Sequence, residues 1–224
     1  MGIVLTEYDL SIMLVPKGAS TTIKHIACEI EYGAPFKPEL FDSRPQHIHE
    51  LYPTELFAKQ GATVDWGKDI FAVVRDPVER IISCHSNRVK HHDELKDLPL
   101  TDEDKEKGVV GRPDFEVFIE HFERYQELSA SIEHHSLPMH VYLGELADIY
   151  TRVFDVADLT EFWEDIRQRV GELPKVEQLQ TGGKQTKARQ ISKATMDKIQ
   201  RIFAKDYDTY GAFLVGKAPT YTVV

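Results

Sequence analysis

The sequence predicts an α/β protein whose central parallel sheet is flanked by helices. Two apolar runs, "SIMLV" at residues 11–15 and "IFAVV" at residues 70–74, have the length and composition of buried strands. A third run, "MHVYL" at residues 139–143, has the same character. Helical patterns alternate with these runs, and such alternation is typical of a parallel sheet covered on both faces.

The helices are predicted from the spacing of apolar residues. In residues 20–31 the apolar side chains share one helical face, and Ser20 or Thr21 is available as the N-cap. Residues 32–52 are expected to be irregular, and a short helix is expected to begin near Pro53. Further helices are expected at residues 78–90, 113–128, 145–154, 159–170 and 192–210.

Length and composition favour a single domain over residues 1–224. At 42% hydrophobic residues, the chain can bury a sizeable core. The formal net charge of −10 argues against a nucleic-acid partner. Much of this charge lies in residues 93–108, "DELKDLPLTDEDKEKG". This run is expected to be a solvated, mobile loop, with a lid over a site as the alternative.

Cysteine usage and hydropathy indicate a cytoplasmic protein. The two cysteines, Cys28 and Cys84, both lie in expected helices, which favours a reducing compartment over a disulfide framework. No apolar run reaches the roughly 18 residues that a membrane-spanning helix needs. The N-terminal segment lacks the basic region and cleavage site of a signal peptide.

The segment "VPKGASTTIKH", residues 15–25, follows the first expected strand and leads into a helix. A strand–loop–helix tip presents unpaired backbone N–H groups and the positive end of a helix dipole, which together suit a phosphate. Gly18 allows close approach of the backbone, and the hydroxyls of residues 20–22 add donors. Lys17 supplies a mobile charge that can meet charge on a leaving group. The alternative is a plain turn capped by Ser20.

A second polar tip follows the strand at residues 70–74. In "VVRDPVERIISCHSNRV", residues 73–89, Arg75 ends the strand and Ser83 lies two turns into the next helix. An arginine fork and a hydroxyl so placed suit a second phosphate. The alternative is a local network of ion pairs among the charged residues at positions 75–80.

Together the two tips resemble the nucleotide-binding signatures of sulfotransferases that use 3′-phosphoadenylyl sulfate (PAPS). The first is similar to their 5′-phosphosulfate loop and the second to their 3′-phosphate strand and helix. The likeness is greatest to the carbohydrate-type branch, with its uronosyl 2-O-sulfotransferases and small bacterial relatives. "HIHELYPTELFAKQG" (residues 47–61) and "AKDYDTYGAF" (residues 204–213) also resemble segments of that branch, in the same order.

The resemblance implies a three-layer fold of the P-loop type and transfer of a sulfuryl group from PAPS to an acceptor hydroxyl. Lys17 would stabilise the leaving oxygen, and Arg75 with Ser83 would hold the 3′-phosphate. The 5′-phosphate would be held by the loop residues Lys17, Gly18, Ala19, Ser20, Thr21 and Thr22. No metal is implied, and the sequence has no convincing metal-ligand spacing.

The resemblance also places the catalytic base in residues 47–61. A histidine suits proton removal from a hydroxyl near neutral pH. His49 is expected to be the base, with His47 as the second candidate. If extended, the segment would direct both side chains the same way.

The stretch "TGGKQTKAR", residues 181–189, lies where family members place a loop over the nucleotide. Its polar side chains could close on phosphate or adenine: Lys184, Thr186, Lys187 and Arg189. Relatives often have Asn-x-Ser/Thr here, whereas this chain has Lys-Gln-Thr, so the adenine contacts stay open. A mobile linker is the alternative.

Two rival functions stay open. A P-loop kinase-like phosphotransferase would place its lysine after the glycines, as G-x-x-x-x-G-K-[ST], and this order is absent. A non-catalytic nucleotide-binding relative would keep the fold and tolerate loss of Lys17 and His49. The acceptor, a small metabolite or a carbohydrate, and the oligomeric state are not specified by the sequence.

Overall fold

The computed structural model describes residues 2–174, 189–216 and 219–224. The chain forms two compact units, each of which draws on separate stretches of sequence. The first unit comprises Met1–Arg75, Met139–Gln180 and Thr209–Val215; the second comprises Asp76–Pro138, Thr181–Asp208 and Gly216–Val224. The expectation of one domain over residues 1–224 stays a prediction.

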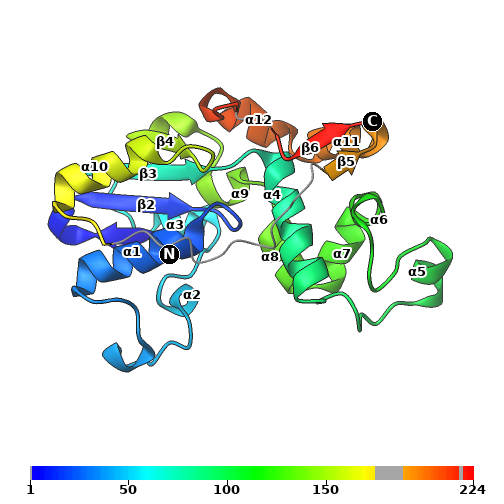
Figure 1. The fold of residues 1–224 in the computed structure, drawn as a ribbon, viewed down its shortest axis with the longest axis horizontal. Coiled ribbons are helices and arrows are strands. Elements are labelled where there is room, and N and C mark those ends of the chain that lie inside the picture. The colour runs from blue at the N-terminus through cyan, green and yellow to red at the C-terminus, as the bar shows by residue number, and fades with distance from the viewer. Residues whose placement is uncertain (1, 175–188, 217–218) are drawn as a thin grey trace. The chain divides into compact units, whose positions relative to one another are not determined.

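A four-stranded sheet forms the centre of the first unit (Figure 1). Its strands lie in the order β1 (Ile3–Leu5), β2 (Leu10–Leu14), β3 (Asp69–Val74) and β4 (Arg152–Asp155). β2, β3 and β4 are parallel, with Ile12 beside Phe71 and Phe71 beside Arg152, whereas β1 is antiparallel to β2. The predicted α/β class, with a central, mainly parallel sheet flanked by helices, is therefore confirmed. β1 was not expected, because three residues are too few to give a recognisable pattern.

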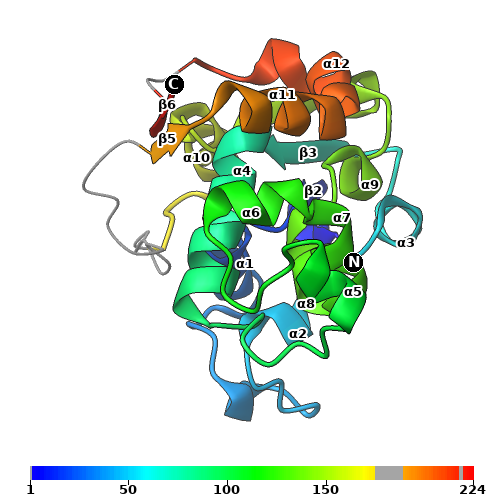
Figure 2. The same ribbon diagram turned by 90° about the vertical axis from the view of Figure 1, so that its right-hand side faces the viewer.

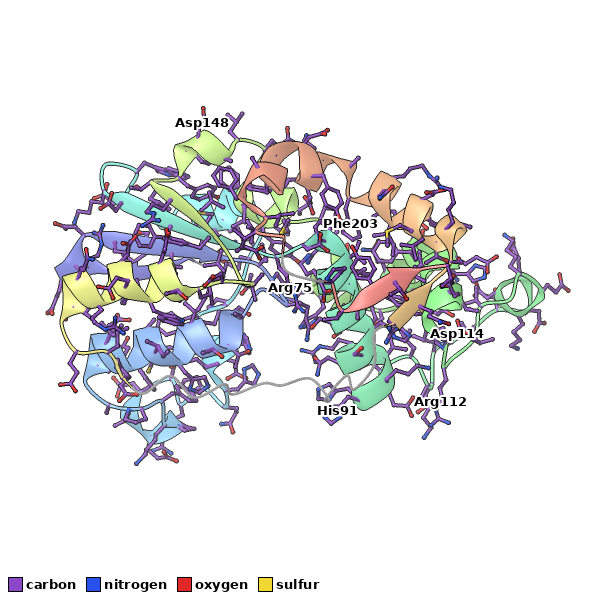
Figure 3. The ribbon with its side chains drawn as sticks, turned by 45° about the horizontal axis from the view of Figure 1, so that its top comes forward. Arg75, His91, Arg112, Asp114, Asp148 and Phe203 are labelled. Carbon is purple, nitrogen blue, oxygen red and sulfur yellow. The ribbon has the colours of Figure 1, made fainter. Side chains whose placement is uncertain are left out.

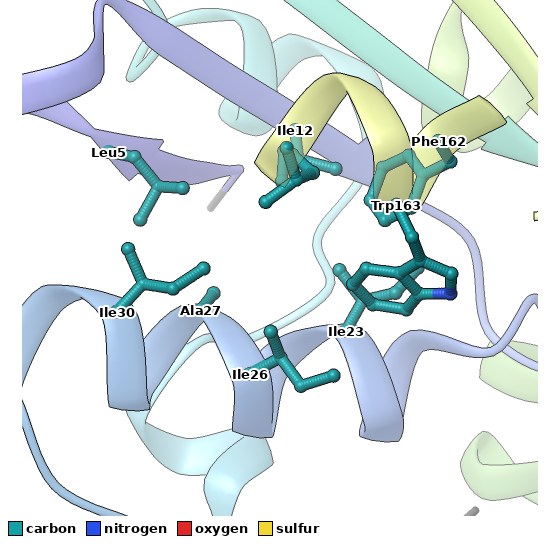
Figure 4. A pocket seen from close by; sticks show the side chains of 9 residues that line it. Leu5, Ile12, Ile23, Ile26, Ala27, Ile30, Phe162 and Trp163 are labelled. Carbon is teal, nitrogen blue, oxygen red and sulfur yellow. The ribbon is translucent and has the colours of Figure 1, made fainter. Parts of the chain in front are cut away.

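Helices α1 (Ser20–Tyr32) and α10 (Thr160–Val170) cover one face of this sheet (Figures 1 and 4). Both occupy the ranges expected from apolar spacing. Alternate residues of β2 and β3, such as Ile12 and Phe71, point to this face because strand side chains alternate. Phe71 and Phe162 pack edge to face, with ring centroids 6.4 Å apart. The two helices are thus held to the sheet by buried apolar side chains.

Helices α3 (Phe57–Gly61) and α9 (His140–Leu143) pack on the opposite face. The Gln60 side chain donates to the Tyr142 carbonyl at 3.0 Å and so joins the two helices. Tyr150 donates its hydroxyl to the Leu143 carbonyl and also contacts the Met13 sulfur at 3.7 Å. The sheet of the first unit is therefore covered on both faces.

Two expectations for residues 139–154 are wrong. The run at residues 139–143 forms the helix α9 rather than a strand, and Gly144 ends it with a φ of 79°. Residues 145–154 contain a 3₁₀ turn, η4 (Ala147–Ile149), and then β4 rather than a helix. A short apolar run whose side chains are all buried has the same pattern as a helical turn or a strand.

Helices build most of the second unit (Figure 2). They are α4 (Pro77–Cys84), α5 (Asp102–Glu106), α6 (Phe115–Glu120), α7 (Phe122–Leu128), α8 (Ala130–Ser136), α11 (Lys193–Ile202) and α12 (Ala204–Tyr210), whose last residues belong to the first unit. Phe118, Tyr125 and Phe203 are fully buried in the core of this unit. A separate parallel pair of strands, β5 (Arg189–Ile191) and β6 (Tyr221–Val223), completes it.

Three expected helices differ in detail from the observed ones. The helix expected at residues 78–90 is α4 followed by a π-helix, η3 (His85–His91). Those expected at residues 113–128 and 192–210 are each divided, at His121 and Phe203, where φ is −110° and −106°. Apolar spacing continues across both breaks, so periodicity alone does not reveal them.

Among residues 2–174, no helix begins near Pro53, so this expectation is also wrong. Two short helices lie on either side instead, α2 (Ile48–Leu51) and α3. Short 3₁₀ turns occupy Thr6–Tyr8 (η1), Pro38–Leu40 (η2) and Gly211–Phe213 (η5). His47 is the N-cap of α2 and has an extended backbone, with φ −150° and ψ 162°, whereas His49 lies inside the helix.

The acidic run at residues 93–108 is not a loop throughout. Residues 102–106 form α5, which begins with a capping box between Thr101 and Asp104. Arg124 donates to Asp104 at 2.8 Å, and Arg112 donates to Asp93 at 2.9 Å. The prediction of a solvated, mobile loop is therefore wrong for the α5 part, and the lid alternative stays a prediction.

Candidate functional site

The loop between β2 and α1 has a backbone shape that suits an anion. Lys17 and Ala19 have φ values of 64° and 56°, in the left-handed region that residues other than glycine rarely adopt. Gly18 between them is not left-handed. Such alternation turns successive N–H groups towards one side and makes an anion-binding concavity. Strained backbone of this kind tends to persist where the surrounding structure requires it for function.

Gly18 is required by close packing rather than by its φ. A Cβ atom at this position would lie 2.7 Å from Cγ2 of Val15 and 3.2 Å from the Val15 carbonyl oxygen. The Gly18 N–H also donates to that carbonyl, at 3.2 Å. The loop therefore folds tightly against the end of β2, and a larger residue would push it away.

The N-cap of α1 is Ala19, so the expectation that Ser20 or Thr21 caps the helix is wrong. In the described part of the chain, no side chain caps this end of α1. Ser20, Thr21 and Thr22 instead form its first turn. The positive end of a 13-residue helix thus adjoins the strained loop, an arrangement that favours a bound phosphate.

Thr21 connects this loop to the segment that carries the candidate base. Its Oγ1 lies 3.0 Å from Nε2 of His49, in α2. The other ring nitrogen of His49, Nδ1, lies 3.1 Å from Nζ of Lys24, one turn further along α1. Lys24 also donates to Thr54 at 2.6 Å. Helices α1 and α2 therefore share a polar cluster of Thr21, Lys24, His49 and Thr54.

Lys24 is the most unusual member of this cluster. Only 1% of the residue is exposed, although lysine is rarely buried so completely. Burial disfavours the charged ammonium and lowers the pKa of Lys24 from 10.5 to about 7. A lysine with such a pKa changes its charge in the physiological range, which marks a functional candidate.

His47, the second candidate base, has different surroundings. Its side chain is 61% exposed, and Nε2 lies 3.3 Å from Oε1 of Glu50 in an ordinary surface pairing. The rings of His47 and His49 are 5.9 Å apart. The structure thus brings His49, and not His47, into the cluster with Thr21 and Lys24.

Arg75 follows directly on β3 (Figure 3). Its Nη1 donates to the carbonyl oxygen of Lys17 at 3.0 Å. The two polar tips that the sequence singles out therefore meet through this hydrogen bond, at neighbouring strand ends. Arg75 therefore supports the shape of the loop from the end of the neighbouring strand.

The rest of the second tip belongs to the second unit. Asp76 caps α4 by accepting from the Glu79 N–H at 3.0 Å, and it also accepts from the Tyr207 hydroxyl at 3.2 Å. Burial raises the pKa of Asp76. Ser83 is partly exposed on α4. Arg80 donates to the carbonyls of residues 136 and 137, and the alternative of an ion-pair network within residues 75–80 stays open.

Of the predicted nucleotide loop, only its last residue is described. Arg189 lies in β5, where it contacts Nδ1 of His85 at 3.2 Å and donates to Ser86 at 3.3 Å. Its guanidinium also stacks on the ring of Phe115, 4.7 Å from the centroid. Lys184, Thr186 and Lys187 lie outside the described residues.

Sequence reasoning missed Lys24 and Thr54. The signal for Lys24 was present, because it falls on the face of α1 that also carries Ala27 and Cys28, both buried. Residues three and four positions apart share one face of a helix, so a lysine at this distance from two buried apolar residues faces the core, where a charge is unusual. Thr54 gave no comparable signal.

The pocket in Figure 4 is part of the hydrophobic core. It lies between α1, α10 and the sheet and is lined by apolar residues such as Ile23, Phe162 and Trp163. No polar side chain points into it to orient a substrate, apart from the indole N–H of Trp163 at its edge. The loop and the polar cluster are therefore the candidate site.

The described residues lack two other features, a membrane-spanning helix and a group of metal ligands. No helix among residues 2–174, 189–216 and 219–224 is long and apolar enough to cross a bilayer. Within the same residues, no three His, Cys, Asp or Glu side chains are grouped as metal ligands.

Together the fold and the loop define an α/β protein with a loop shaped for an anion at the carboxyl ends of parallel strands, the usual site of ligands in such sheets. The model of the sulfotransferase family matches residues 2–213. The chain therefore belongs to the sulfotransferase family, as its motifs predicted. No curated protein and no solved structure gives a significant match.

Proposed function

We propose that the protein transfers a sulfuryl group from PAPS to a hydroxyl group of a small-molecule or carbohydrate acceptor. The hydrogen-bonding contact between Thr21 and His49 carries this proposal, because it joins a phosphate-type loop to a candidate base in one unit. Membership of the sulfotransferase family supports sulfuryl transfer in general. The donor, the base and the role of Lys17 are the proposed parts.

The loop fits a donor with a phosphosulfate group. Glycine at position 18 and the left-handed residues on both sides of it form a cradle that an added Cβ would disturb. The backbone of residues 17–22 and the hydroxyls of residues 20–22 would hold the 5′-phosphate, and Arg75 would hold the 3′-phosphate. The role expected for Ser83, in the second unit, stays a prediction. When bound, PAPS would supply a sulfuryl group whose S–O bond to the 5′-phosphate breaks as a bond to the acceptor oxygen forms.

The side chains of this chain have two tasks in the proposed reaction. Lys17 would supply an ammonium group to stabilise the charge that develops on the leaving oxygen. His49 accepts the proton of the acceptor hydroxyl at Nε2, the nitrogen that faces Thr21. Positioning in line and charge stabilisation supply most of the acceleration, since no covalent intermediate is needed.

Thermal unfolding with three nucleotides tests the donor. Adenosine 3′,5′-bisphosphate at 100 times its Kd should stabilise the protein by about 2.7 kcal/mol, whereas AMP at the same concentration should shift the transition much less. A shift by ATP with Mg²⁺ but none by the bisphosphate would favour a kinase-like phosphotransferase. Transfer of labelled sulfate from PAPS across a panel of hydroxyl acceptors then tests turnover, and binding without turnover would favour a non-catalytic relative.

Replacing Arg75 by alanine should weaken bisphosphate binding by about 1–3 kcal/mol, because charge-assisted hydrogen bonds are lost. Arg75→Lys should recover only part of the affinity, since lysine lacks the planar fork. Calorimetric titration with the bisphosphate measures both. Arg167→Ala is the matched control, because Arg167 is exposed on α10 and pairs with Glu164. Equal affinities for all these variants would remove Arg75 from the site.

A further inference from the structure

Lys24 belongs to the polar cluster but has no role in the proposed reaction. The role inferred for it rests on the proposed function. Its Nζ lies 3.1 Å from Nδ1 of His49 and 2.6 Å from Oγ1 of Thr54. At 1% exposure, it is shielded from solvent and is not placed to touch an acceptor. Its effect on the reaction must therefore pass through His49.

The contacts of the His49 ring with Lys24 and Thr21 allow two arrangements of protons. A neutral imidazole carries one proton, so one ring nitrogen donates and the other accepts. In the first arrangement the Lys24 ammonium donates to Nδ1, and Nε2–H donates to the Thr21 hydroxyl. In the second, neutral Lys24 accepts from Nδ1–H, and the Thr21 hydroxyl donates to Nε2. Only the second arrangement leaves a lone pair on Nε2 that can take a proton from an acceptor.

We infer that Lys24 is a positioning residue that, as a neutral amine, accepts the Nδ1 proton of His49 and so keeps Nε2 unprotonated, as a base requires. The amine would fill the place that a carboxylate fills in a catalytic triad, where it holds the imidazole in the productive tautomer. One amine hydrogen still donates to Thr54, so the lone pair of Nζ faces His49. Thr21 Oγ1 occupies the position from which an acceptor hydroxyl would donate to Nε2.

The proton balance of this arrangement is simple. The acceptor proton binds Nε2, and His49 becomes an imidazolium whose Nδ1–H still donates to Nζ of Lys24. The lone pair of Lys24 stabilises this cation without adding a second charge. The proton then leaves Nε2 for solvent, and the first state is restored.

Burial supports the neutral form of Lys24. It lowers the pKa of this lysine to about 7, so the amine is mainly neutral above that pH and mainly an ammonium below it. Titratable groups near the cluster have partners of their own: His47 pairs with Glu50, Tyr52 donates to Glu31, and Glu55 pairs with Lys59. On α1 itself, His25 packs against Phe36. Burial is the cause of the shift.

Nitrogen NMR of ¹⁵N-histidine-labelled protein tests the inference without any turnover. At pH 8.5 the wild-type protein should show the Nδ1–H tautomer for His49. Lys24→Met keeps the length of the side chain and removes the amine, so His49 should change to the Nε2–H form that free imidazole prefers. His25 is the internal control, and its signals should not change. An Nε2–H tautomer in the wild-type protein at pH 8.5 would overturn the inference, whatever the fate of the variant.

Kinetics give a second readout. Lys24→Met should lower kcat by roughly 10- to 100-fold, the size seen when the partner that orients a functional histidine is removed. Bisphosphate affinity should be unchanged. Below pH 7 the wild-type kcat/KM should fall more steeply with acid than that of the variant, because protonation of Lys24 also disables the base. The inference would be contradicted if kcat/KM fell equally steeply below pH 7 in the wild-type protein and in Lys24→Met and if kcat were unchanged.

The NMR and kinetic measurements distinguish a failure of this inference from a failure of the proposed function. If His49 has the Nδ1–H tautomer only when Lys24 is present, Lys24 sets the tautomer even where no acceptor is sulfated. If PAPS is used but the His49 tautomer is independent of Lys24, sulfuryl transfer stands and the role of Lys24 falls. Should Lys24→Met unfold, the wild-type spectrum at pH 8.5 still decides the question.

Discussion

Replacing Lys17 by alanine is expected to lower kcat by about 100- to 1,000-fold, the usual loss when a group that stabilises developing charge is removed. The ammonium meets charge that exists mainly in the transition state, so bisphosphate binding should be largely kept. The backbone should also be kept. Alanine has the same Cβ penalty as lysine at a φ of 64°, and the Lys17 carbonyl that accepts from Arg75 remains.

Single-turnover sulfate transfer and calorimetry with the bisphosphate measure the two effects of Lys17→Ala separately. Lys59→Ala is the matched control, because Lys59 is an exposed lysine of the same unit and pairs only loosely with Glu55, at 3.5 Å. This control should retain both turnover and binding. Turnover near the wild-type rate in Lys17→Ala would refute the role of the ammonium.

The sequence predicted best those features that neighbouring residues along the chain determine, such as a buried strand and the polar residues that follow it. Apolar runs at residues 11–15 and 70–74 predicted β2 and β3, and the polar residues that follow each strand indicated one ligand-binding edge. The hydrogen bond between Arg75 and Lys17 agrees with that expectation. Parallel strands bring their carboxyl ends together, so neighbouring tips could be related without knowledge of distant contacts.

Features that depend on tertiary packing could not be predicted in the same way. The run at residues 139–143 has the pattern of a buried strand, yet α9 forms because its side chains pack between the sheet and neighbouring helices. The cluster around His49 joins residues 21 and 24 to residues 49 and 54, and it depends on how α2 packs against α1. No periodicity encodes that contact, because the intervening segment is irregular.

The second large effect is expected for His49. His49→Gln should lower kcat by about 100- to 10,000-fold, the range in which a positioned general base contributes. Glutamine is polar and of similar length, so it can still meet the Thr21 hydroxyl and limit disturbance of α2. It cannot accept a proton near neutral pH. Bisphosphate affinity should stay close to the wild-type value, since in the proposed reaction His49 serves the acceptor and not the donor.

His47→Gln is the matched control for this substitution, because His47 lies two residues away and faces Glu50 at the surface. It should retain most activity. The pH dependence of kcat/KM distinguishes a base from a merely structural residue: the acid limb of the wild-type profile should vanish in His49→Gln and persist in His47→Gln. If His49→Gln remains active while His47→Gln does not, the exposed histidine is the base, and the cluster of Thr21, Lys24 and His49 then has a structural role only.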